Sequence, residues 1–149
     1  MPVAVSNRQR AVWVSAPRLR RAGERALAAV GRASEELSLT LVDDREIRRL
    51  NRRYRRAHRR TDVLAFPLDP PLVGEVVISA ETARRQAGLL RVPVALELDL
   101  LVTHGVLHLA GYDDHEPIDA MRMHEREREI LAGAASSIPA RLWTGLLPA

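Results

Sequence analysis

The segment that organises this chain runs from residue 93 to residue 115 and reads PVALELDLLVTHGVLHLAGYDDH. Pro93 suits the first turn of a helix, and the residues after it form the most apolar helical stretch of the sequence, up to about Ala110. Gly111 then favours the end of that helix. A helix that is apolar on nearly every side is buried, so we expect this one at the centre of the fold.

Two histidines near the end of this predicted helix suggest a metal site. His104 and His108 are four residues apart, so their side chains lie on one helical face, stacked by a single turn. This spacing lets two imidazoles reach one metal ion at about 2.0–2.1 Å. Gly111 allows the chain to turn back, and a residue just past the turn can supply a third ligand. Three protein ligands with one open position are typical of catalytic zinc sites.

The residue after the first histidine argues against a zinc peptidase. In metallopeptidases with a related spacing, Glu follows the first His and acts as the general base. Here Gly105 holds that position, so a peptidase would lack its base. Peptidase activity therefore stays the less favoured alternative.

Length and composition limit the remaining possibilities. The chain has 149 residues, of which 46% are apolar, enough for the core of one domain. It contains no Cys, so a metal must bind to His, Asp or Glu. All 23 basic residues are Arg, and the net charge of +4 is only weak evidence for a nucleic-acid partner. We see no targeting segment and no apolar run of about 18 residues, so we expect a soluble, cytoplasmic protein.

The periodicity of apolar residues predicts an α+β fold. Short apolar or alternating runs predict about four strands, at residues 3–5, 37–42, 63–66 and 74–79. Helical spacing predicts about five helices: at 16–30, after a cap at Asp43 or Asp44, after a cap at Ser79, at 93–110, and after Pro117. We expect residues 1–149 to form a single compact domain with a small mixed sheet and the metal site at the end of the central helix. Regular structure should span roughly 2–132, followed by an irregular tail at 133–149.

The segment from His104 to Asp114 resembles the signature H-G-x-L-H-L-x-G-Y-D-H of the YbeY family of bacterial endoribonucleases. Every position matches except the last, the third His of the family, where this chain has Asp114 followed by His115. Upstream, residues 61–67 resemble the family's T-D-V-L-S-F-P with Ala65 for Ser, and residues 74–79 resemble its G-D-I-V-I-S strand with Glu75 for Asp. The resemblance covers about 37–131.

The resemblance also bears on the third metal ligand. The family usually has Met nine residues after its third His and Glu four residues further on. Counting from Asp114 leads to Met123 and Glu127, whereas counting from His115 leads to His124 and the match fails. We therefore predict His104, His108 and Asp114 as the ligands, with His115 as the alternative third ligand. Asp is a good zinc ligand. An oxygen ligand in place of a nitrogen ligand makes the site harder, in the sense of hard and soft metal ligands.

Membership of this family would imply a metal-dependent endoribonuclease specific for single-stranded RNA. It would act in maturation of the 16S rRNA 3′ end and in ribosome quality control, with one divalent ion, expected to be Zn²⁺. The family's functionally important Arg in its Tyr-Arg pair falls on Arg55, which we expect to neutralise charge on the phosphate in the transition state. Whether a metal-activated water or a ribose 2′-OH attacks the phosphodiester stays open.

A stripe of arginines precedes the second half of the chain. Nine Arg lie between Arg45 and Arg60, opposed only by Glu46; we call this segment the arginine stripe. A charge run is often just a solvated helix face, but RNA phosphates would relieve the repulsion within it. We expect the stripe to bind rRNA or other single-stranded RNA by its backbone, in the context of the ribosomal subunit or its proteins. We expect no membrane partner and no DNA specificity.

A different class of function remains open at this point. The chain could be a ribosome-assembly factor that binds RNA through the arginine stripe and uses its metal only for structure. Such a protein would bind RNA without cleaving it.

Overall fold

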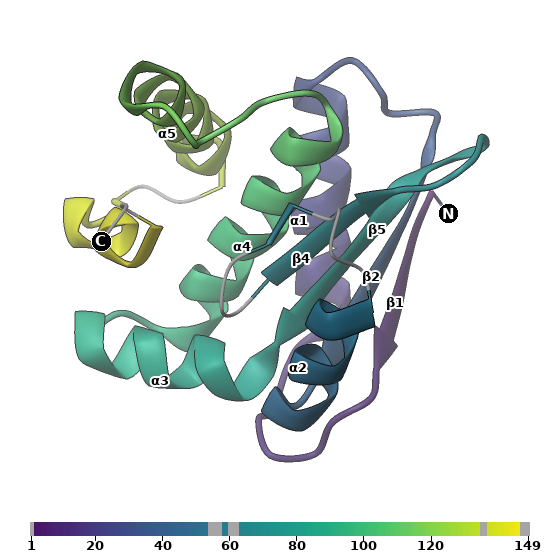
Figure 1. Cartoon of the computed structure of the whole chain (residues 1–149). Helices are drawn as coiled ribbons and strands as arrows, with labels where there is room; N and C mark the ends of the chain where they lie inside the picture. Colours follow the sequence, from purple (N-terminus) through teal and green to yellow (C-terminus); the bar gives the residue numbers. More distant parts are fainter. Residues whose placement is uncertain (1, 54–57, 60–62, 135–136, 147–149) are drawn as a thin grey trace.

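One mixed sheet of five strands carries the fold, in the order β1-β2-β5-β4-β3 (Figure 1). In this computed structural model, which describes residues 2–53, 58–59, 63–134 and 137–146, the strands are β1 (Val3–Asn7), β2 (Glu36–Val42), β3 (His58–Arg59), β4 (Val63–Pro67) and β5 (Leu72–Ser79). β1, β2 and β5 are parallel, whereas β4 runs antiparallel to β5 and β3 antiparallel to β4. The four predicted strands are confirmed. The fifth, β3, has only two residues, too few to leave a pattern in the sequence.

Among the described residues, five α-helices accompany the sheet, as predicted: α1 (Ala16–Ala29), α2 (Asp44–Arg53), α3 (Ala80–Leu90), α4 (Val94–Leu109) and α5 (Pro117–Ala132). Ser79 caps α3 by accepting a hydrogen bond from the backbone N–H of Thr82. Of the two candidates for the cap of α2, Asp43 accepts from the backbone N–H of Glu46 at 2.8 Å. The chain is thus an α+β domain of the expected class.

The alternation of side chains along β4 and β5 explains how the helices divide between the two faces of the sheet. Val76 and Ile78 belong to the large core shared with α1 and α4, whereas Val77 between them packs with Leu64 and with Ile47 of α2. Successive side chains of a strand point to opposite faces. α1 and α4 therefore cover one face, and α2 covers the other.

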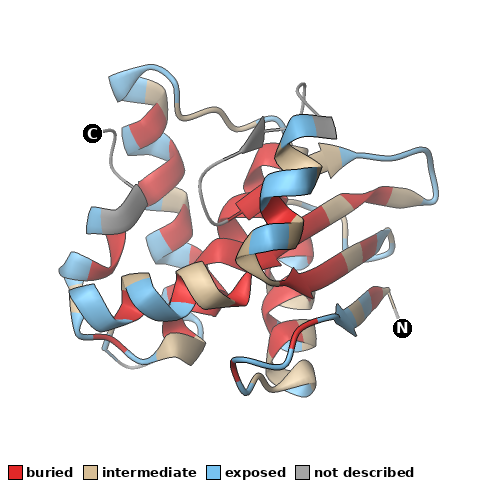
Figure 2. Cartoon of the chain, turned by 60° about the horizontal axis from the view of Figure 1, so that its bottom comes forward, coloured by how far each residue is buried: buried red, intermediate tan, exposed pale blue. Residues whose placement is uncertain are grey.

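α4 is buried along almost its whole length, as its composition predicts (Figure 2). Every residue from Leu96 to His108 is buried. The helix lies close against the sheet at Gly105, where a Cβ atom would come within 2.7 Å of the Val76 side chain. Gly105, whose place in the sequence argues against a peptidase, thus has a packing role, because it permits this close approach of α4 to β5.

The segment after α5 differs from the prediction of an irregular tail. A 3₁₀ helix, η1 (Ala140–Leu146), forms there, and Leu142 and Trp143 are buried in the core. Arg141 anchors η1 by donating from Nε to the carbonyl of Leu90 at 2.8 Å and from Nη2 to that of Arg91 at 3.0 Å. The small residues and prolines of this segment gave no periodic signal, so its order depends on these tertiary contacts.

In the described part of the chain, no single helix is both long and apolar enough to cross a membrane. α3 and α4 together reach the required length and composition, but they meet at an angle of 118°.

Candidate metal centre

His104 and His108 point towards each other from the last two turns of α4. Their Nε2 atoms are 3.1 Å apart, and both residues are buried. The Nδ1 atom of His104 lies 2.7 Å from the Glu127 carboxylate, and that of His108 lies 3.0 Å from the carbonyl oxygen of Tyr112. Both partners are hydrogen-bond acceptors, so each Nδ1 must carry the proton and donate it. In the neutral rings, both Nε2 atoms then present lone pairs to one another.

The turn after α4 brings a carboxylate to the same point. Gly111 adopts a φ of +102°, and the backbone N–H of Tyr112 donates to the carbonyl of Leu107 at 3.0 Å. The chain reverses there, and Asp114 places its two oxygens 3.5 Å from Nε2 of His104 and 3.6 Å from Nε2 of His108. His104, His108 and Asp114 together could hold a metal ion.

The separations among these three side chains fit a tetrahedral ion. Ligand atoms at about 2.0–2.1 Å from a tetrahedral zinc lie roughly 3.3 Å from one another. The two Nε2 atoms are 3.1 Å apart, and the approaches of the carboxylate, 3.5 Å from Oδ2 to His104 and 3.6 Å from Oδ1 to His108, are close to that value. Two lone pairs and a carboxylate repel unless a cation lies between them, so the donor set suits a divalent ion.

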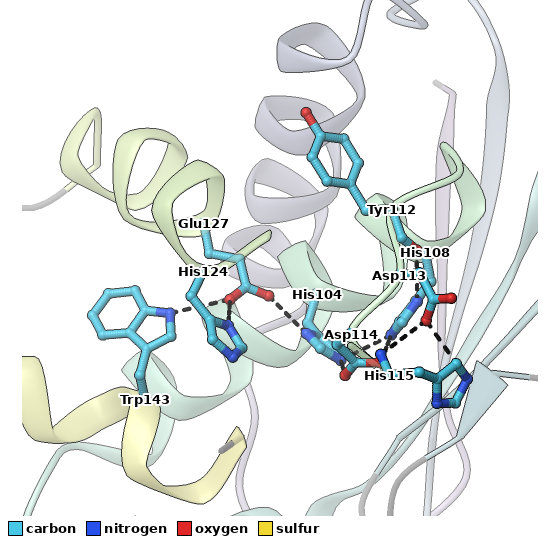
Figure 3. A network of polar contacts seen from close by, with 9 residues as sticks. All are labelled: His104, His108, Tyr112, Asp113, Asp114, His115, His124, Glu127 and Trp143. Atoms are coloured by element: carbon cyan, nitrogen blue, oxygen red, sulfur yellow. Dashed lines mark hydrogen bonds and ion pairs between the residues drawn. The ribbon is translucent and has the colours of Figure 1, made fainter. Parts of the chain in front are cut away.

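His115, the alternative third ligand, lies elsewhere. Its ring is exposed, and its Nε2 lies 3.6 Å from the Asp113 carboxylate. Asp113, Asp114 and His115 also have ligand atoms near one another, but this second group lies towards the surface. The geometry thus brings Asp114, and not His115, together with the two buried histidines (Figure 3).

A buried carboxylate behind His104 is the most important feature that our sequence reasoning missed. Glu127 is fully buried on α5 and accepts three hydrogen bonds, from His104 Nδ1 at 2.7 Å, His124 Nδ1 at 2.7 Å and Trp143 Nε1 at 3.1 Å (Figure 3). Burial acts to raise the pKa of Glu127, but the hydrogen bonds from His104 and His124 outweigh it and lower the pKa below its ordinary value. Glu127 is therefore an anion at neutral pH.

A signal for Glu127 was present in the sequence. Ala120, Met123, Glu127 and Ile130 follow one another at helical spacing, and this face of α5 is buried. A carboxylate in an otherwise apolar row requires a partner. The family comparison used Glu127 only to align the third ligand, and the spacing alone did not reveal that it would meet His104.

The predicted catalytic Arg55 lies outside the described residues, as do Arg56 and Arg60. The described part of the arginine stripe includes Arg45, Arg49 and Arg52 on α2. These residues line a cavity of about 370 Å³ together with Arg8, which follows β1, and the acidic Asp43 and Glu46. Arg49 forms an ion pair with Glu46 at 2.7 Å. The tertiary structure thus adds Arg8 to the basic surface that the stripe predicted.

Comparison with known proteins agrees with this architecture. Residues 4–135 match the family model described as Endoribonuclease YbeY. A protein named Endoribonuclease YbeY from Anaeromyxobacter sp. (strain Fw109-5) is 49% identical over 131 residues, covering 81% of this chain and 68% of its own. One from Geobacter metallireducens is 43% identical over 143 residues, covering 89% of this chain and 95% of its own.

A solved structure extends the agreement to the fold. A solution structure of a Thermotoga maritima protein superimposes with a TM-score of 0.60 at 25% identity, over 97% of this chain and 91% of that one. Sequence and fold therefore agree, and this chain belongs to the YbeY endoribonuclease family.

Proposed function

We propose that this protein is a metal-dependent endoribonuclease that cleaves single-stranded RNA, with one zinc ion held by His104, His108 and Asp114. The observation that carries the proposal is the convergence of two imidazole lone pairs and a carboxylate at one point, with spacings of 3.1–3.6 Å. Membership of an endoribonuclease family supports RNA as the substrate. Maturation of the 16S rRNA 3′ end and ribosome quality control in the cytoplasm are the cellular roles we infer for it.

The side chains around the site have separable tasks. A divalent ion, when bound, would lower the pKa of a coordinated water and polarise a phosphoryl oxygen. Glu127 and the Tyr112 carbonyl fix the orientation and tautomer of His104 and His108. Asp114 keeps 17% of its side-chain surface exposed, so substrate can approach from that side. Arg55 would neutralise charge growing on the phosphate.

The basic surface supplies affinity for RNA. Arg8, Arg45 and Arg52 surround one cavity, and the single exposed tryptophan of the described residues, Trp13, lies on a different cavity. Phosphate contacts without aromatic stacking bind the backbone and do not read the sequence. We infer that the ribosomal subunit and its proteins supply selectivity.

Parallel digestions of RNA and casein, each with and without a chelator, test this function. We expect chelator-sensitive cleavage of RNA and none of casein. RNA binding without turnover would instead support an assembly factor with a structural metal. Casein cleavage would support a peptidase. Its general base would then have to be a residue other than Gly105, which packs against Val76.

A further inference from the structure

A hydrogen bond between η1 and Glu127 links this 3₁₀ helix to the proposed metal centre. Trp143 is 3% exposed, and its indole Nε1–H donates to Oε1 of Glu127 at 3.1 Å. The other oxygen, Oε2, accepts from His104 at 2.7 Å. One carboxylate thus connects η1 to a proposed metal ligand. Trp143 lies beyond residues 4–135, which match the family model.

The two oxygens of Glu127 have to be held in different directions. The terminal torsion of a Glu side chain is broad and only weakly restricted by its own geometry. His124 holds Oε1 at 2.7 Å, but it lies three residues before Glu127 on the same helix. Trp143 comes from a different element and fixes the same oxygen from outside α5. Together they direct Oε2 towards His104.

The position of Trp143 does not depend on this hydrogen bond alone. Arg141 binds the carbonyl oxygens of Leu90 and Arg91 at the end of α3, and Leu142 is fully buried. The guanidinium of Arg128 lies 4.8 Å from the centroid of the Trp143 ring. These contacts hold the indole in place before it meets Glu127, which is what a preorganised support requires.

We propose that Trp143 is a positioning residue of the metal centre, which fixes Glu127 and through it the orientation of His104, so that docking of η1 tightens metal binding. This inference rests on the proposed metal site. Partners that orient a metal-ligating histidine typically contribute 10–100-fold to metal affinity. Trp143 acts on His104 only through Glu127, so it is one hydrogen bond further from the metal position. The loss of Trp143 should therefore weaken metal binding less than the loss of Glu127.

A spectroscopic test uses the unmodified protein. The chain has two tryptophans, of which Trp13 is 86% exposed and Trp143 is buried against Glu127. In ¹⁵N-labelled protein stripped by chelator, addition of Zn²⁺ should shift the indole N–H resonance of Trp143 and leave that of Trp13 in place. A Trp143 resonance that stays unmoved while one equivalent of zinc binds would overturn the proposal.

Zinc competition against a chelator gives the second test. Trp143→Phe keeps an aromatic ring but removes the N–H, and we expect it to weaken zinc binding by up to roughly tenfold, against roughly 10–100-fold for Glu127→Gln. Trp13→Phe is the matched control, because it makes the same substitution at the exposed tryptophan, which lines a separate cavity. It should leave zinc affinity unchanged.

The outcomes separate this inference from the proposed function. If the wild type binds zinc and Trp143→Phe binds it equally well, the role of Trp143 is wrong and the metal site stands. Equal losses in Trp143→Phe and Trp13→Phe would also overturn it, because the effect would then not come from the contact with Glu127. If the wild type binds no zinc, the metal site and this inference fall together.

Discussion

At the scale of single residues, the proposed metal centre is defined by which atoms of each side chain face its middle. His104 and His108 both turn Nδ1 towards an acceptor, which leaves Nε2 of each facing the other at 3.1 Å. Asp114 stands in the place where the family signature has a third His. A bound divalent ion would have its charge balanced by Asp114 and the buried anion Glu127, so this centre is less positive than one built from three neutral histidines.

The choice between Asp114 and His115 can be tested by metal content. We expect Asp114→Ala to lose most of its bound zinc, because its oxygens lie 3.5–3.6 Å from both histidine nitrogens. His115→Ala should retain it, because that ring is exposed beside Asp113. Elemental analysis of the two purified variants against the wild type measures the effect. The reverse order would make His115 the ligand.

Arg55 provides a second prediction at this scale. If it contacts the phosphate in the transition state, Arg55→Ala should cut RNA cleavage by roughly 10²–10³-fold while metal content and fold stay intact. Arg52→Ala removes another charge of the arginine stripe and should weaken RNA binding only mildly. Cleavage rates with a labelled single-stranded RNA compare the two. Equal small effects at both positions would show that Arg55 contributes only to the electrostatic surface.

At the scale of elements, two contacts fix the position of α4 and α2 on the sheet. Gly105 brings α4 against Val76, and this contact sets the depth at which His104 and His108 lie. Asp44 at the start of α2 accepts hydrogen bonds from Ser79 at 2.6 Å, from Arg85 at 2.8 Å and from Thr82. This cluster ties the helix that carries the arginine stripe to the start of α3.

Gly105→Ala should destabilise the protein even though Ala is the better helix former. The new Cβ would lie 2.7–2.8 Å from the methyl groups of Val76, and overpacking of this kind costs about 1–3 kcal/mol, against a gain of about 1 kcal/mol in helix propensity. Denaturant unfolding measures the difference. Adding Val76→Ala should recover part of the loss. A destabilisation that the second substitution leaves unchanged would place the cause elsewhere.

The Asp44 cluster predicts a dependence of stability on pH. Burial acts to raise the pKa of Asp44, but hydrogen bonds from Arg85, Ser79 and Thr82 outweigh it and lower the pKa from 3.8 to about 2. The stabilisation is therefore complete above pH 3.8 and is lost as the pH falls through about 2. Because Arg85 is exposed, we expect the Asp44 cluster to contribute only on the order of 1 kcal/mol to the free energy of unfolding.

Asp44→Asn tests this dependence on pH. The variant should be less stable than the wild type at pH 7, and the difference in the free energy of unfolding should shrink towards pH 2. A difference that is constant with pH would contradict this origin.

At the scale of the whole molecule, the sheet brings together charges that are far apart in the sequence. Arg8 follows β1 and Arg45 begins the arginine stripe, yet both line one cavity. The backbone N–H of Arg8 donates to the carbonyl of Leu41 at 2.8 Å, which places it at the same end of the sheet as the start of α2. The proposed RNA surface is therefore wider than the stripe.

Salt titration of RNA binding tests this wider surface. Arg8→Ala should lower the slope of log K against log salt by about one unit, because each phosphate contact releases counterions on binding. Arg21→Ala is a suitable control, since Arg21 is an exposed arginine on α1, which covers the opposite face of the sheet from α2. Equal slopes for Arg8→Ala and the wild type would exclude Arg8 from the RNA surface.

The sequence by itself determined the elements whose signals are local. The apolar run after Pro93 predicted α4, the alternation of residues 37–42 predicted β2, and the i, i+4 histidines predicted one face of the helix. Periods of 3.6 and 2 residues are local properties of the sequence. The family signature added the third ligand position and Glu127 as an alignment marker. All of these depend on residues within a few turns of one another.

Only the tertiary structure decided which distant groups meet. Glu127 lies 23 residues after His104 and accepts a hydrogen bond from it, and Trp143 donates to Glu127 from a segment without periodicity. Arg8, which follows β1, lines one cavity with residues of α2. The two-residue β3 exists only because β4 offers it a partner. Such contacts depend on the packing of whole elements, and packing is set by the combined shape of the core, which no local spacing in the sequence encodes.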